Sequence, residues 1–99
     1  MASKSKAKGN RFEKQLVDKA KETGLEAVRA WGSNGRALGH HEEVDLVIGN
    51  GIKVQAKCRA NIADYIKPSE HVDVQIIKED RGQILVVMRF EEWLELIRE

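Results

Sequence analysis

The sequence predicts a single α/β domain in which a mixed β-sheet of about five strands is flanked by helices. Three features predict this fold class: amphipathic segments at both ends of the chain, alternating apolar and charged residues between them, and glycine-rich turns that separate the alternating segments. A chain of 99 residues has room for one domain with a small core. Hydrophobic residues make up 41% of the chain, so we expect it to fold rather than stay disordered.

The first part of the chain predicts a basic arm followed by a helix. Residues 1–9 are small, polar and basic, and we expect them to form a flexible arm ahead of a domain over residues 10–99. Asn10 is a favourable N-cap, and Glu13 follows it as in a capping box, so the helix is expected to begin near Asn10. Gly24 is a suitable residue to end it. The apolar face of this helix has helical spacing and consists of Phe12, Leu16, Val17 and Ala20.

The middle of the chain predicts three strands. Residues 25–31 alternate apolar and charged, residues 44–48 are mostly apolar, and residues 52–58 alternate strictly. Glycines at both ends of residues 49–51 are a strong turn signal, so the second and third strands are expected to form a hairpin.

The last third predicts two more strands and a helix. Residues 60–67 are expected to be a short helical or irregular stretch that ends at the only proline, Pro68. Residues 72–77 and 84–90 predict strands, and the second is so apolar that we expect it to be central in the sheet. The terminal helix is expected over residues 91–98, with one apolar face formed by Trp93, Leu94 and Ile97.

The charge of the chain is unevenly distributed. The formal net charge is +1, but residues 1–39 carry +5, residues 40–52 carry −3, residues 53–67 carry +3, and residues 68–99 carry −4. This asymmetry favours a basic surface that binds a polyanion, and the alternative is charged surface that is merely solvated. The chain has no apolar run near the ~20 residues of a membrane span, no apolar stretch after its basic start, and a single cysteine. We therefore expect a cytoplasmic protein with no membrane partner.

Four polar side chains form the main candidate for a chemical site. Asp45 lies within an apolar strand, and Gln55 and Lys57 share one face of the next strand. The hairpin brings Asp45 near this pair, and Glu13 lies at the edge of the apolar face of the first helix. Carboxylate and amide oxygens suit Mg²⁺, and a lysine beside the ion stabilises charge on a phosphate. The cluster therefore predicts hydrolysis of phosphodiesters.

Each of these residues also has a purely structural interpretation. Glu13 is equally well explained as the capping partner of Asn10. Gln55 and Lys57 are compatible with ordinary outward positions of an alternating strand, and Asp45 with an edge-strand surface position. The combination of Asp45, a tight turn and Gln55-x-Lys57 is more informative than any of its parts.

This combination resembles the PD-(D/E)XK nuclease superfamily. Residues 8–13 and 31–37 more narrowly resemble the archaeal-type Holliday junction resolvases, and Gln-x-Lys is similar to the motif of VRR-type nucleases, which include small viral proteins. The resemblance implies a restriction-endonuclease-like core and a homodimer that cuts four-way DNA junctions. It also implies Mg²⁺ as the cofactor, with Mn²⁺ as a second suitable ion. The metal ligands it implies are Glu13, Asp45 and Gln55, and the catalytic lysine is Lys57.

The resemblance adds a serine and several basic residues. In the resolvases a serine in the first glycine-rich loop matters for cleavage, so Ser33 with Arg36 is expected at the scissile phosphate; the alternative is a plain flexible loop. Residues 40–43 are two histidines and two glutamates, which we interpret as a solvated loop rather than a second metal site, and Cys58 as a buried thiol. The predicted DNA-binding residues are Lys4, Lys6, Lys8, Arg11, Arg36 and Arg59.

Two other function classes remain open. Gln55 stands where the family has glutamate, which removes one negative charge and favours a DNA-binding protein with a weak or inactive nuclease site. The second class is a structural or adaptor protein that uses residues 84–97 as an interaction surface. The same segment is the expected dimer interface, with Trp93 either as its anchor or as part of the core.

Overall fold

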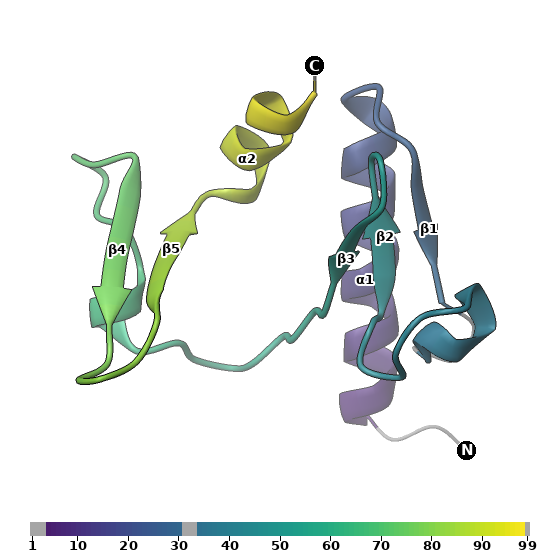
Figure 1. Ribbon diagram of the computed structural model, residues 1–99, viewed down its shortest axis with the longest axis horizontal. Helices are drawn as coiled ribbons and strands as arrows, with labels where there is room; N and C mark the ends of the chain where they lie inside the picture. The colour runs from purple at the N-terminus through teal and green to yellow at the C-terminus, as the bar shows by residue number, and fades with distance from the viewer. Residues whose placement is uncertain (1–3, 31–33, 99) are drawn as a thin grey trace.

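The computed structural model describes residues 4–30 and 34–98. The predicted α/β class with five strands is confirmed, and the strands are divided between two antiparallel sheets (Figure 1). The elements, in chain order, are α1 (Lys4–Glu22), β1 (Ala27–Arg29), the 3₁₀ helix η2 (Gly35–Leu38), β2 (Leu46–Ile48), β3 (Ile52–Val54), the 3₁₀ helix η3 (Asp64–Ile66), β4 (Val74–Lys78), β5 (Ile84–Met88) and α2 (Phe90–Ile97).

The first helix begins earlier than the sequence predicts. It starts at Lys4, so residues 4–9 are helical, and the prediction of an N-cap at Asn10 is wrong. Lysine and alanine in this segment have high helix propensity, which outweighs the cost of about 1 kcal/mol for Gly9 inside a helix. The predicted end is confirmed: Gly24 has φ +95°, and Leu25 N–H donates to the Ala20 carbonyl at 3.0 Å.

The N-terminal unit consists of α1 and the three-stranded sheet β1–β2–β3. The predicted hairpin is confirmed: Ile48 pairs with Ile52 across a turn in which Gly49 and Gly51 both have positive φ. Helix α1 covers one face of this sheet (Figure 1). The core cluster is formed by Leu16, Val17, Ala20, Leu46, Ile48 and Leu94. Strand β3 ends at Val54, four residues before the predicted end.

The C-terminal hairpin consists of β4 and β5, and it forms a separate sheet. The prediction that residues 84–90 are a central strand is wrong, because β5 pairs with β4 alone. Its apolar side chains remain exposed: Ile84 is 67% exposed and Val86 is 59% exposed. The apolar pattern predicts burial, but β5 pairs only with β4 among the described residues and its apolar side chains are not covered. Figure 1 shows the chain after β3 running from the N-terminal unit to this hairpin; residues 55–63 form no helix or strand, and η3 follows them.

Helix α2 returns the chain to the N-terminal unit. Leu94 is buried in the core cluster, and Trp93 and Ile97 pack partly against it, as the sequence predicts. Lys19 Nζ lies 2.9 Å from Glu91 Oε1, which ties α1 to α2. This hydrogen bond is the main cause of a raised pKa for Lys19 and a lowered pKa for Glu91. The pair therefore contributes at neutral pH and is lost in acid, as the pH falls through the lowered pKa of Glu91. Among the helices described, none is long and apolar enough to cross a membrane.

Candidate active site

Glu13 is a buried carboxylate that is paired with an arginine. It lies on the face of α1 that packs on the sheet and is 5% exposed. Arg29, the last residue of β1, places Nη2 3.1 Å from Glu13 Oε1 and 3.3 Å from Asn10 Oδ1. The Arg29 Nε atom is buried and has no hydrogen-bond partner among the described residues. Asn10 therefore does not cap the helix. It lies within α1, and its side chain accepts a hydrogen bond from Arg29.

Asp45 is held directly against the segment that carries Gln55 and Lys57. It is 9% exposed, and its Oδ2 accepts a 2.7 Å hydrogen bond from the backbone N–H of Ala56. Its own N–H donates to the Val54 carbonyl at 2.8 Å. These bonds continue the contact between the two chain segments beyond the point where β3 ends. The sequence-based expectation that the hairpin brings Asp45 near Gln55-x-Lys57 is confirmed.

The end of β1 connects the two carboxylates. Arg29 contacts Glu13, and the next residue, Ala30, donates its N–H to the Asp45 carbonyl at 2.9 Å. Glu13 and Asp45 are therefore placed by two adjacent residues, the last residue of β1 and the one that follows it. Within residues 4–30 and 34–98, no three His, Cys, Asp or Glu side chains come together as a metal-binding group. Two carboxylates and the amide oxygen of Gln55 are nevertheless a donor set that fits Mg²⁺, which takes one or two carboxylates and keeps several waters.

Gln55 and Lys57 are exposed and line a groove of about 690 Å³, which we call the Lys57 groove. They alternate with Val54 and Ala56, which pack partly against the core cluster. The other walls of the Lys57 groove come from α1, from the end of β5 and from α2; they include Phe12, Leu16, Val87, Met88, Phe90 and Trp93. The lysine is thus available to a ligand from solvent, at the free edge of the three-stranded sheet.

The loop before Asp45 is closely packed around Gly35. The Asn34 side chain accepts a 3.0 Å hydrogen bond from the Arg36 N–H and caps η2. A Cβ atom on Gly35 would collide with the His41 carbonyl, so glycine is required for this close approach. Arg36 is exposed and pairs with Glu42 at 3.1 Å. Ser33 lies outside the described residues, so its predicted role stays a prediction.

The structure agrees with the prediction for the histidine–glutamate loop but not with the prediction for Cys58. Residues 41–43 are exposed, and the Glu43 N–H donates to His41 Nδ1 at 3.1 Å, which agrees with a solvated loop. Cys58, by contrast, is only half-buried, so its prediction as a buried thiol is wrong. It borders a pocket of about 460 Å³ with Lys8 and Arg59. Two of the predicted DNA-binding residues, from α1 and from the segment after Lys57, are therefore neighbours.

Sequence analysis missed Arg29. Residues 25–31 are predicted as a half-buried alternating strand, and that prediction assigns Arg29 no role. Leu25 and Ala27 pack against the core cluster, and Arg29 follows at the same spacing, so it shares their inner face. An arginine on the inner face of a half-buried strand requires an anionic partner. This signal was available in the sequence, and it points to Glu13.

The structure thus holds a buried glutamate on the first helix, an aspartate just before β2 and a Gln-x-Lys segment bonded to that aspartate. The chain matches the family model of the archaeal Holliday junction resolvase (Hjc) over residues 4–98, and it belongs to this family. It is therefore a resolvase-like nuclease that acts on DNA in recombination and repair. No curated protein and no solved structure matches the chain significantly.

Proposed function

We propose that this protein is a metal-dependent, structure-selective endonuclease that cuts four-way DNA junctions, with Mg²⁺ as the cofactor. The observation that carries the proposal is the 2.7 Å hydrogen bond between Asp45 Oδ2 and Ala56 N–H, because it fixes the metal-binding candidate Asp45 beside Lys57. Membership of the resolvase family supports branched DNA as the substrate.

Each residue of the site has a distinct role in this proposal. Glu13, Asp45 and Gln55 would hold the ion, which, when bound, activates water and stabilises charge on the phosphate. Lys57 places its ammonium at the reacting phosphate from the exposed side of the segment. Arg29 orients Glu13 and balances its charge while the carboxylate is buried. Ser33 and Arg36 are proposed to contact the scissile phosphate.

A weak or inactive DNA-binding protein is the second candidate, and Gln55 favours it. An amide oxygen ligates Mg²⁺ but contributes no negative charge, so the affinity for the metal is reduced. The discriminating experiment compares cleavage by the wild type and by Gln55→Glu across a range of Mg²⁺ concentrations. If the natural protein is an active enzyme, the wild type and Gln55→Glu both cleave the junction, and the cleavage rate of the variant reaches its maximum at a lower Mg²⁺ concentration. Cleavage by Gln55→Glu alone would identify the natural protein as the inactive form.

Removing basic side chains from the start of α1 is expected to weaken DNA binding and its salt dependence. Lys4 is exposed, and Lys8 lies beside Arg59. Each lost phosphate contact flattens the slope of log K against log[salt] by ~0.9 on B-form DNA. The measurement is the salt dependence of junction binding for Lys4→Gln/Lys8→Gln. Lys21→Gln, which changes an exposed lysine at the other end of α1, is the control. An unchanged slope in the double variant would show that these lysines do not touch DNA.

We further propose that the protein acts as a homodimer, because resolving a junction takes two coordinated cuts and twofold symmetry supplies two sites. The C-terminal hairpin offers a surface: Ile76, Ile84 and Val86 share one face and are 62%, 67% and 59% exposed. An isolated two-stranded sheet is marginally stable, and exposed apolar patches commonly mark interfaces. Of the two roles expected for Trp93, the core role is favoured, because Trp93 packs partly against the core cluster and its ring lies 5.9 Å from that of Phe90.

The dimer is tested by sedimentation of the wild type and of Ile84→Lys, and the role of Trp93 by the unfolding of Trp93→Ala. Ile84→Lys adds a charge to the exposed hairpin face and is expected to give a folded monomer. Trp93→Ala is expected to lower the free energy of unfolding, since it removes a side chain that packs partly against the core. A wild-type protein that is monomeric at micromolar concentration would remove the paired-cut mechanism.

A further inference from the structure

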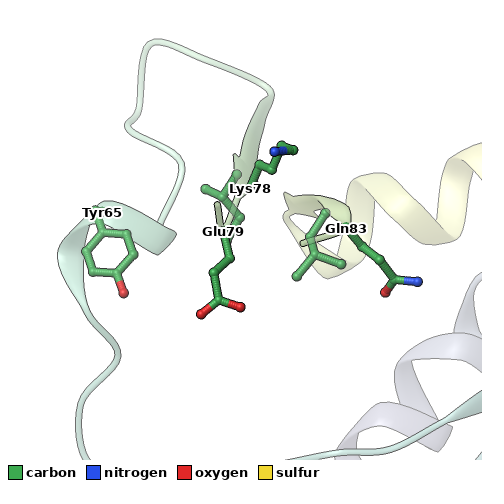
Figure 2. A pocket seen from close by; sticks show the side chains of 6 residues that line it. Tyr65, Lys78, Glu79 and Gln83 are labelled. Atoms are coloured by element: carbon green, nitrogen blue, oxygen red, sulfur yellow. The ribbon is translucent and has the colours of Figure 1, made fainter. Parts of the chain in front are cut away.

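A second pocket lies on the C-terminal hairpin and shares no lining residue with the Lys57 groove. It has a volume of about 410 Å³, within the range of small-molecule sites. Its lining combines an aromatic ring, two aliphatic side chains and three polar groups (Figure 2). We call it the Tyr65 pocket; it is lined by Tyr65, Ile77, Lys78, Glu79, Gln83 and Leu85.

The Tyr65 pocket is built by contacts that hold η3 against the hairpin. Ile77 and Leu85 are register partners across β4 and β5, so they share one face of the hairpin. Gln75 and Val87 form the next pair on that face, and the Gln75 side chain donates a 2.8 Å hydrogen bond to the Tyr65 carbonyl. This bond holds η3 against the hairpin. The Tyr65 side chain nevertheless remains 72% exposed, so its ring is available to a ligand.

We propose that the Tyr65 pocket receives an unpaired nucleobase of the DNA substrate. This inference rests on the proposed function. A base stacks on an exposed aromatic ring, and the aliphatic pair Ile77 and Leu85 offers an apolar surface beside it. In Figure 2 the Glu79 carboxylate and the Tyr65 ring extend in the same direction, and the Gln83 amide lies on the far side of Glu79. Glu79 accepts a hydrogen bond from an amino group on the base edge, and Gln83 donates or accepts.

The charge of the connecting segment supports DNA as the occupant. The residues between Lys57 and Asp64 include Arg59 and no acid, and Asp64 is paired with Lys67 at 3.0 Å. A DNA strand held at Lys57 therefore meets no unpaired carboxylate along this segment before it reaches Tyr65. The opposite face of the hairpin carries Ile84 and Val86, together with Lys78. The apolar walls of the Tyr65 pocket, Ile77 and Leu85, therefore lie on the other face from the proposed dimer surface.

Chain length limits where the base lies relative to the cut. Tyr65 follows Lys57 by eight residue steps in the sequence. At ~3.3–3.6 Å per extended residue they span at most about 28 Å, which corresponds to about eight nucleotide steps of ~3.4 Å. A DNA strand that runs directly from Lys57 to Tyr65 therefore places the base within the first eight nucleotides on either side of the cleaved phosphate. Bases near a branch point are already weakly stacked, which lowers the cost of taking one into the Tyr65 pocket.

The test combines abasic DNA with Tyr65 variants, and it measures binding without cleavage. Four-way junctions that lack one base, at each of these positions in turn, are titrated with the protein in EDTA and followed by fluorescence anisotropy. For the wild type, one abasic position should weaken binding about 5- to 150-fold, the range for loss of one base–aromatic stack. Tyr65→Ala should bind the intact junction more weakly by the same factor. Its affinity should not fall further when the junction lacks the base at that position. Tyr65→Phe should behave as the wild type, because the ring is retained.

A control variant shows whether the abasic penalty depends on Tyr65 in particular. Leu96→Ala removes another strongly exposed apolar side chain, 70% exposed on α2, and should leave the abasic penalty unchanged. An abasic penalty of equal size in the wild type and in Tyr65→Ala would overturn the inference and leave the proposed function standing. So would loss of self-association in Tyr65→Ala, since the Tyr65 pocket would then be an interface between two copies. Failure of the wild type to bind any junction would overturn the proposed function itself.

Discussion

Lys57→Ala is expected to lower the rate of junction cleavage by about 10²–10³-fold, the usual cost of removing one charge-stabilising donor from an active site. The reason is its position: Lys57 follows Ala56, whose N–H is bonded to Asp45, and its side chain lies in the open Lys57 groove. The ammonium is proposed to act on the reacting phosphate rather than to hold the duplex. Single-turnover cleavage should therefore fall while the Kd for the junction changes little.

Lys53→Ala is the matched control for Lys57→Ala. Lys53 is an exposed lysine of β3 that also lines the Lys57 groove, so both variants remove one positive charge from the same surface. A purely electrostatic effect on DNA binding should appear in both variants. Cleavage by Lys57→Ala at the wild-type rate, or an equal loss in Lys53→Ala, would contradict the assignment of Lys57.

Arg29→Ala is expected to have the largest effect on stability. It removes the guanidinium partner of Glu13, a carboxylate that is 5% exposed, and breaking a buried ion pair in this way typically costs ~3–5 kcal/mol. Because the Arg29 side chain is 33% exposed, solvent screening reduces the expected loss to about 2–3 kcal/mol. Urea unfolding measures this as a lower midpoint with an unchanged slope.

The double variant separates charge from packing. Arg29→Ala/Glu13→Gln removes both charges, so it should recover a substantial part of the stability lost in Arg29→Ala. If Glu13 is a metal ligand, Mg²⁺ should also stabilise Arg29→Ala more than it stabilises the wild type, because the ion replaces the missing positive charge. A double variant no more stable than Arg29→Ala would show that Arg29 acts through packing rather than through Glu13.

The local signals in the sequence predicted the N-terminal unit well. The Gly49–Gly51 turn and the alternation of residues 52–54 fixed the hairpin, and with it the contact between Asp45 and the Gln55-x-Lys57 segment. The start of α1 was predicted wrongly, because a capping signal at Asn10 was preferred to the helix propensity of the residues before it. Asn10 contacts Arg29 instead, a long-range interaction that no local pattern reveals.

Long-range placement was harder to predict. The apolar composition of residues 84–88 indicates that this strand should be covered, but composition does not say whether the cover comes from the same chain or from another. Among the described residues β5 pairs only with β4, and Ile84 is 67% exposed. The Tyr65 pocket was likewise hidden from the sequence, because it depends on the hydrogen bond from Gln75 that seats η3 on the hairpin.

The most direct test of the whole account is cleavage of a four-way junction by the purified chain, with Mg²⁺ and with EDTA, on DNA labelled on each strand in turn. Asp45→Asn is the matched variant, since it keeps the shape of the side chain and removes the charge held beside Lys57. The account predicts Mg²⁺-dependent cuts at symmetric positions on two opposing strands, and their loss in EDTA and in Asp45→Asn. Cleavage that persists in EDTA, or that is as fast in Asp45→Asn as in the wild type, would contradict it.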